Sequence, residues 1–169
     1  MDVFHEQLVK VKLNAWSYIM MVLIVISALF LSAFLFLYSL EIPILVLLVV
    51  GVIYGAVKLL SLFNVEYEYI ITNGTVDIDK ITAKSSRKRV LSFECKDILR
   101  SGKYNPKSAP VTGAEATLVC CTSDDPQAYY LLVSAAGKKK LLIFTPNDKM
   151  KAGIRECAPR NMSKDLFND

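Results

Sequence analysis

The feature that most constrains this chain is a pair of long apolar runs near its N-terminus. The first run, residues 16–40, contains no charged side chain, and the second, residues 44–63, contains only Lys58. About 20 apolar residues are enough for a helix to cross the hydrocarbon core of a membrane. Backbone groups in lipid must be satisfied within their own helix, so two such runs with a short connection predict an antiparallel transmembrane hairpin over residues 15–63.

Lysine residues beside the two runs predict how the hairpin is oriented. Lys and Arg close to a span are retained on the cytoplasmic side of the membrane. Lys10, Lys12 and Lys58 flank the runs, whereas the connection between them carries only Glu41. We therefore expect a multi-pass protein of the inner cell membrane with both termini in the cytoplasm.

Small residues within the runs predict close packing of helices. Gly51 and Gly55 form a G-x-x-x-G pair in the second run, and Ala28 and Ser32 lie four residues apart in the first. Small side chains let helix backbones approach each other in lipid. Two explanations fit this spacing, namely packing between the two helices of the hairpin and a homodimer face.

The segments before and after the hairpin contain charged as well as apolar side chains. Residues 1–14 place Phe4, Leu8 and Val11 at helical spacing, which predicts a short interfacial helix before the first span. Residues 64–169 mix charged and apolar side chains, and they are numerous enough for one domain with its own core. A cytosolic domain is therefore predicted to begin directly after the hairpin.

The predicted cytosolic domain begins with patterns that are typical of β-strands. Apolar and charged side chains alternate from Val65 to Ile71, and Asn73-Gly74 follows, the favoured dipeptide of a two-residue hairpin turn. Asp77 and Asp79 in the next strand are expected on its solvated face rather than at a metal site. The predicted strands cover residues 65–71, 75–83, 90–95, 116–121, 128–135 and 139–144.

One amphipathic helix is predicted after the last of these strands. Thr145 and Pro146 supply a hydroxyl N-cap and a proline at the first helical position. Met150, Ile154 and Cys157 then lie on one apolar stripe, and Pro159 follows the stripe. The expected helix covers about residues 146–158.

This order of elements is typical of pleckstrin-homology-like (PH-like) domains, in which one C-terminal helix closes a strongly bent antiparallel sheet. Two spans followed by residues 65–81, VEYEYIITNGTVDIDKI, resemble bacterial membrane proteins with a cytosolic PH-like domain. With the N-terminal segment Phe4–Lys10, FHEQLVK, the chain resembles more closely a small uncharacterised bacterial family of this architecture. The resemblance implies a membrane α-helical hairpin, an α+β soluble domain and a seventh strand, which is expected within residues 96–115.

The sequence contains few of the residues and motifs that are typical of catalytic or metal sites. Nucleotide-binding and hydrolase motifs are absent, and His5 is the single histidine, which leaves little scope for the commonest general base. Cys95, Cys120, Cys121 and Cys157 lack metal-ligand spacing and are expected as small core residues. The net charge of +4 is small for a nucleic-acid binder. No catalytic residue, metal, cofactor or nucleic-acid partner is predicted.

A basic segment after the second predicted strand is the candidate binding feature. Lys84, Arg87, Lys88 and Arg89 fit a lipid-headgroup contact at the negative inner leaflet, and they equally fit an ordinary solvated turn. We therefore predict a non-enzymatic, membrane-anchored binding or regulatory module that recognises a protein partner or anionic lipid headgroups. The alternative is an accessory subunit of a larger integral-membrane complex, and the third hypothesis is an unrecognised enzyme.

Overall fold

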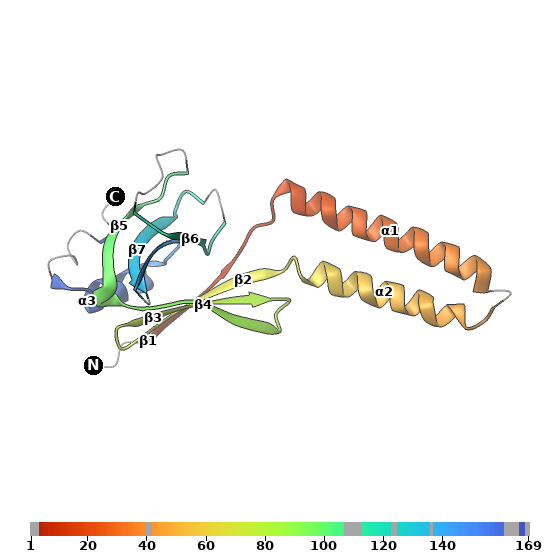
Figure 1. Ribbon diagram of the computed structural model, residues 1–169, viewed down its shortest axis with the longest axis horizontal. Coiled ribbons are helices and arrows are strands. Elements are labelled where there is room, and N and C mark those ends of the chain that lie inside the picture. Colours follow the sequence, from red (N-terminus) through yellow and green to blue (C-terminus); the bar gives the residue numbers. More distant parts are fainter. Residues whose placement is uncertain are drawn as a thin grey trace. The chain divides into compact units, whose positions relative to one another are not determined.

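The computed structural model describes residues 4–39, 42–106, 113–122, 125–135, 137–160 and 166–167. The chain divides into two compact units (Figure 1). The helical unit contains residues 12–65 and 82–84, and the sheet unit contains residues 1–11, 66–81 and 85–169.

The helical unit consists of two helices that contact each other (Figure 1). Helix α1 spans Ala15–Ser39 and helix α2 spans Leu45–Ser61. Asn14 lies just before α1, where its side-chain oxygen accepts a hydrogen bond from the Ser17 amide at 2.9 Å. Helix α1 has the length and apolarity of a membrane-crossing helix, whereas α2 is a shorter apolar helix. The predicted connection passes through residues 40 and 41, which lie outside the described residues.

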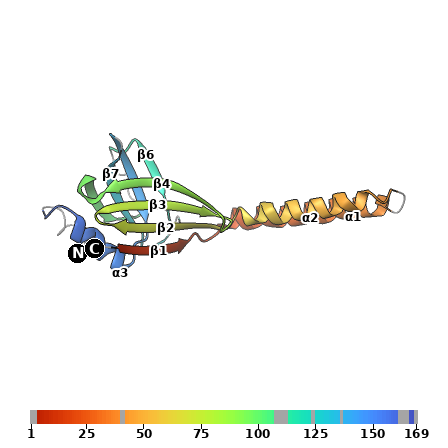
Figure 2. The same ribbon diagram turned by 90° about the horizontal axis from the view of Figure 1, so that it is seen from below.

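The first sheet of the sheet unit joins strands from both sides of the two helices in the sequence. Its strand order is β1-β2-β3-β4, and Figure 2 shows β1 alongside β2. Strand β1 pairs antiparallel with β2, with Phe4 opposite Thr72 and Lys10 opposite Glu66. The strands are β1, Phe4–Lys10; β2, Val65–Thr72; β3, Thr75–Thr82; and β4, Ser86–Glu94.

Strand β1 shows that the predicted interfacial helix over residues 1–14 is wrong. Exposed and half-buried residues alternate along Phe4–Lys10, as in a strand. The apolar spacing of Phe4 and Leu8 fits a helix and a strand equally well, because residues four apart lie on one face of either element. An isolated helix of this length is marginal in water, whereas pairing with β2 satisfies a row of backbone groups that a sheet edge would otherwise expose. The N-terminal segment is therefore part of the domain that follows the helices.

The second sheet contains four further strands in the order β5-β7-β8-β6. Strand β5 is the seventh strand expected within residues 96–115, and it follows a 3₁₀ turn at Cys95–Asp97. Strand β7 pairs antiparallel with β5 and β8, but β6 pairs parallel with β8, which departs from the predicted antiparallel arrangement. The strands are β5, Ile98–Lys103; β6, Ala116–Val119; β7, Tyr129–Ala135; and β8, Lys138–Phe144.

Helix α3, Asp148–Cys157, follows β8 and contributes Met150 and Ile154 to the apolar core. Its N-cap is Asn147 rather than the predicted Thr145, because the Asn147 side-chain oxygen accepts a hydrogen bond from the Met150 amide at 2.8 Å. The predicted apolar stripe is confirmed, since Met150 and Ile154 are buried and the half-buried Cys157 packs against the same core.

The core of the sheet unit contains side chains from both sheets. Tyr69 of β2 and Phe144 of β8 are fully buried, and their rings meet edge to face with centroids 5.6 Å apart. Burying one large apolar side chain contributes about 1.5–3 kcal/mol, so this shared core is what holds the two sheets together. The fully buried side chains of the unit include Tyr69, Ile71, Val76, Ile78, Ile98, Leu131, Leu142, Ile143, Phe144, Met150, Ile154 and Leu166.

Candidate functional site

Arg87 of the predicted basic segment forms an ion pair on the first sheet. Its guanidinium lies 2.9 Å from Glu68 Oε1 and 2.8 Å from Oε2. Glu68 is only 4% exposed. A carboxylate withdrawn from water is costly unless it is paired, so Arg87 compensates Glu68 and does not present its full charge to solvent.

Arg89 also forms ion pairs, with two acidic residues of β3. Its Nη1 lies 3.0 Å from Asp77 Oδ2, and its Nε lies 2.9 Å from Asp79 Oδ1. The prediction that both acids are solvated is wrong for Asp79, which is buried beneath the arginine. The alternation correctly separated these acids from the inward-facing Val76 and Ile78, but it could not show that a residue of β4 covers them.

The two lysines of the predicted basic segment are exposed. Lys84 lies in the turn between β3 and β4, where Ala83 and Lys84 adopt left-handed φ angles of 55° and 56°. Lys88 lies on β4. Among the described residues neither lysine has an ion-pair partner. The four predicted lipid-contact residues therefore divide into two arginines paired within the sheet and two solvated lysines.

The carboxylate of Glu6 affects the pKa of Glu68. Burial raises the pKa of Glu68 above its ordinary value, and the nearby Glu6 of β1, which is within hydrogen-bonding reach, raises this pKa further, whereas Arg87 lowers it. A carboxyl whose pKa is higher in the folded state than in the unfolded state destabilises the fold as the pH rises from the unfolded pKa through the folded pKa. Glu68 therefore opposes folding at neutral pH.

We expect Glu6→Gln to raise the thermal midpoint of unfolding at pH 7, because it removes the carboxylate that repels ionised Glu68. The increase should become smaller as the pH is lowered, because protonation of Glu68 removes the repulsion. Differential scanning calorimetry of the full chain in detergent at pH 7 and at lower pH tests this expectation. Glu156→Gln on the exposed face of α3 is the matched control, and an equal increase for this variant would contradict the repulsion.

The small residues predicted to pack helices differ in their surroundings. Ala28 and Ser32 are half-buried on α1, whereas Gly51 is exposed on α2. A Cβ atom placed on Gly51 or Gly55 would meet no atom within 4 Å. Contact between α1 and α2 thus leaves open space beside both glycines.

A pocket that the sequence did not predict lies beside the start of α3 in the sheet unit. Its volume is about 420 Å³, and we call it the α3 pocket. Its lining residues come from β5, the segment before β7, β7 itself and the start of α3; they are Lys103, Pro126, Gln127, Tyr129, Pro146, Asn147, Asp148 and Lys151.

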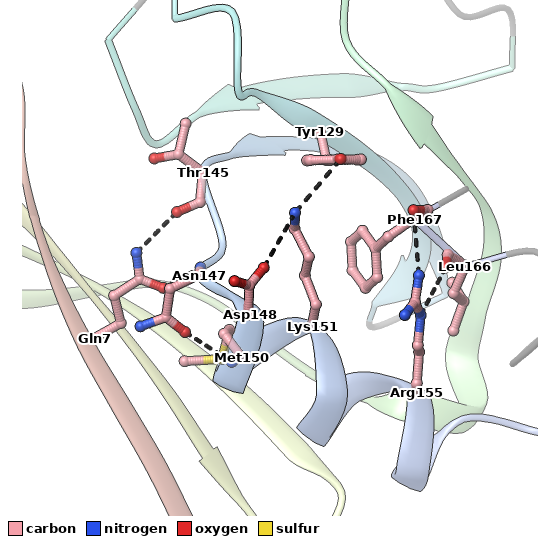
Figure 3. Close-up of polar contacts among 10 residues, drawn as sticks. All are labelled: Gln7, Tyr129, Thr145, Asn147, Asp148, Met150, Lys151, Arg155, Leu166 and Phe167. Carbon is pink, nitrogen blue, oxygen red and sulfur yellow. Dashed lines mark hydrogen bonds and ion pairs between the residues drawn. The ribbon is translucent and has the colours of Figure 1, made fainter. Parts of the chain in front are cut away.

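Lys151 lines the α3 pocket, and Tyr129 constrains its ammonium (Figure 3). Its ammonium lies 4.5 Å from the centroid of the Tyr129 ring and 3.4 Å from the Tyr129 hydroxyl. Its ion-pair partner Asp148 has a fully exposed carboxylate 3.9 Å from the ammonium. Ion pairs of that kind are weak because water screens them, so the ring and hydroxyl of Tyr129 fix the position of this charge.

Gln7 of β1 holds the segment that leads into α3. Its side-chain nitrogen donates to the Thr145 carbonyl at 2.9 Å, and its side-chain oxygen accepts from the Asn147 amide at 2.8 Å. The Gln7 side chain thus satisfies two backbone groups of this segment, as a neighbouring strand would (Figure 3). The N-terminal strand therefore helps to shape one wall of the α3 pocket.

The four cysteines lie in or against the apolar core, as the sequence predicted. Cys95, Cys120 and Cys121 are buried, and Cys157 is half-buried. Burial raises the pKa of Cys95 and of Cys120 to about 12 and the pKa of Cys121 to about 11, which disfavours the nucleophilic thiolate. Among the described residues, no three His, Cys, Asp or Glu side chains form a group that could hold a metal ion.

Comparison with known proteins places these features in a family. A family model described as "Bacterial PH-like domain (DUF6106)" matches residues 1–164. No match was found among curated proteins or among solved structures. The matched range includes β1 and both helices, so the family model covers the helical unit as well as the two sheets.

Proposed function

The chain belongs to this family of bacterial PH-like domains, and we propose that it is a membrane-anchored binding or regulatory module without catalytic activity. PH-like domains are generally binding modules, and function on such a fold resides in sites rather than in the fold itself. The proposal therefore depends on how the domain is anchored and on which surfaces it presents.

The pairing of β1 with β2 is the observation that carries the membrane part of the proposal. Strand β1 precedes the two helices in the chain, β2 follows them, and the two strands are neighbours in one sheet. A bilayer cannot pass between hydrogen-bonded strands, so both strands lie on the same side of any membrane that the intervening chain crosses. The number of crossings must then be even.

If α1 is one crossing, an even number requires a second, and we propose that α2 is the returning span of a transmembrane hairpin. Helix α2 contains 17 residues, or about 25 Å of helix, against a hydrocarbon core of about 30 Å. Apolar residues extend the run at both ends, with Ile42, Pro43 and Ile44 before the helix and Leu62 and Phe63 after it. The flanking lysines favour a cytoplasmic location for both termini and for the sheet unit, at the inner membrane of a bacterium.

The C-terminal helix completes the proposed PH-like architecture. Ile154 and Met150 of α3 share a core with residues of both sheets, which supports a closing role for α3 at one opening of the sheets. In this arrangement the outward faces and edges of the sheets remain available for binding.

We propose a protein partner as the ligand of the exposed face of β1. Phe4 and Leu8 project from this edge strand with 60% and 49% of their surface exposed. Apolar side chains on a strand edge suit the addition of a partner segment. Contact with anionic lipid headgroups through Lys84, Arg87, Lys88 and Arg89 has weaker support, because the two arginines are paired with acids of the sheet.

The accessory-subunit hypothesis has an observation of its own. The open space beside Gly51 and Gly55 suits close approach of another transmembrane helix, either from a second copy of this chain or from a larger complex. This hypothesis places the main contact in the membrane rather than on the sheet.

Affinity capture of the tagged full chain in a mild detergent separates the two hypotheses. We expect a stoichiometric partner that Phe4→Ser/Leu8→Ser reduces at least about tenfold, while Leu99→Ser, at another exposed apolar residue, leaves capture unchanged. Gly51→Leu/Gly55→Leu should also leave it unchanged. If the glycine variant abolishes capture and the β1 variant does not, the accessory-subunit hypothesis replaces our proposal.

A further inference from the structure

We propose that the α3 pocket binds a phosphomonoester group. This inference concerns a part of the sheet unit that is separate from the exposed face of β1, and it does not depend on the membrane hairpin or on a protein partner. A volume of about 420 Å³ is within the usual range for small-molecule sites and exceeds what a bare phosphate would fill.

The charges of the pocket lining favour an anion. Lys103 approaches from the end of β5, and Lys151 approaches from α3. Among the described lining residues Asp148 is the acidic one, and its fully exposed carboxylate is 3.9 Å from Lys151. An incoming phosphate dianion would meet the ammonium groups of both lysines, and water already screens the Asp148 carboxylate beside Lys151.

The side chain of Lys151 is held in position before a ligand arrives. Only 23% of its surface is exposed, and its ammonium is fixed over the ring of Tyr129. Tyr129 is itself buried and packs edge to face on Phe167, with ring centroids 5.4 Å apart. Such preorganisation lowers the entropy that binding must overcome.

The chemistry of the lining fits a phosphate ester. Lysine binds phosphate as a point charge, and the described lining of the pocket contributes two lysines. The amide of Gln127 adds a donor, and Pro126 and Pro146 offer apolar surface to the organic part of the ligand. The Met150 amide at the start of α3 already donates to the Asn147 side chain.

Isothermal titration calorimetry of the full chain in a neutral detergent tests the proposal with glycerol 3-phosphate and with dihexanoyl phosphatidic acid below its micellar concentration. Both probes carry a phosphomonoester, one from a soluble source and one from a lipid source. We expect saturable binding of at least one probe, and Lys151→Met and Lys103→Met should each weaken it about tenfold or more. Binding of the lipid probe alone would assign the ligand to the membrane, and binding of the soluble probe would assign it to the cytosol.

Lys149→Met is the matched control, because it removes the same charge from the exposed side of α3. It should leave the affinity within about twofold of the parent. Thermal unfolding of each variant confirms that it is folded, and methionine preserves the apolar stem that packs on Tyr129. The proposal is overturned if the parent binds neither phosphomonoester, if Lys103→Met/Lys151→Met binds as the parent does, or if dihexanoyl phosphatidylglycerol, a phosphodiester, binds equally well.

Discussion

A variant in which a four-residue glycine–serine turn replaces residues 12–63 is expected to be soluble and folded, whereas a fragment that begins at Val65 is expected to be less stable by several kcal/mol. The turn variant retains both parts of the sheet unit. Lys10 and Glu66 are directly opposite each other in the ladder, so a short turn can join the strands that the helices separate in the natural chain. Asn64 is kept because its carbonyl accepts the Ala83 amide at 2.9 Å.

The fragment loses stability because β1 is absent from it. Each hydrogen bond of the β1–β2 ladder contributes about 1 kcal/mol net, and the contacts of Gln7 with Thr145 and Asn147 are lost as well. Urea unfolding followed by far-ultraviolet circular dichroism measures both proteins. Equal midpoints for the two would show that β1 is not part of the folded domain.

Ile154→Ala is expected to lower the free energy of unfolding by about 2–4 kcal/mol. Ile154 has no exposed surface and lies at the centre of the buried face of α3, so the truncation creates a cavity that its neighbours cannot easily fill. The position is also close to β1, since a Cβ on the adjacent Gly153 would lie 2.9 Å from the His5 ring.

The measurement for Ile154→Ala is chemical unfolding of the soluble turn variant, in which the helices do not contribute to the signal. Glu156→Ala, an exposed position of the same helix, should change stability by less than about 0.5 kcal/mol. A loss for Ile154→Ala that is no larger than this control would contradict a closing role for α3.

Most strands after Val65 were predicted because their signals are local, although β4 begins at Ser86, within the segment that was predicted as a basic turn. Alternation of period two specifies one buried face, and the Asn73-Gly74 turn is confirmed by positive φ angles of 48° and 88° at these residues. The seventh strand, Ile98–Lys103, could only be placed within a broad range, because Gly102 and the prolines beyond it are typical of a loop.

Strand β1 and the α3 pocket were missed because they depend on contacts between distant residues. The seven residues of β1 fit two periods, and their partner follows only after both helices. Gln7 contacts residues 138 and 140 positions further along the chain. The sequence around Arg89 does not indicate its ion pairs, because only the fold places Asp77 and Asp79 beside it.

The pairing of β1 with β2 across the two helices is the central claim, and oxidative cross-linking in native membranes tests it most directly. Phe4 and Thr72 are exposed and opposite each other in the register, at the Cα separation of about 4.5–5.5 Å that a disulfide requires. We predict that Phe4→Cys/Thr72→Cys forms a peptide cross-link between residues 4 and 72, identified by mass spectrometry, while the out-of-register pair Leu8→Cys/Thr72→Cys does not. Absence of the first cross-link, or equal formation of both, would contradict the paired strands and with them the even number of membrane crossings.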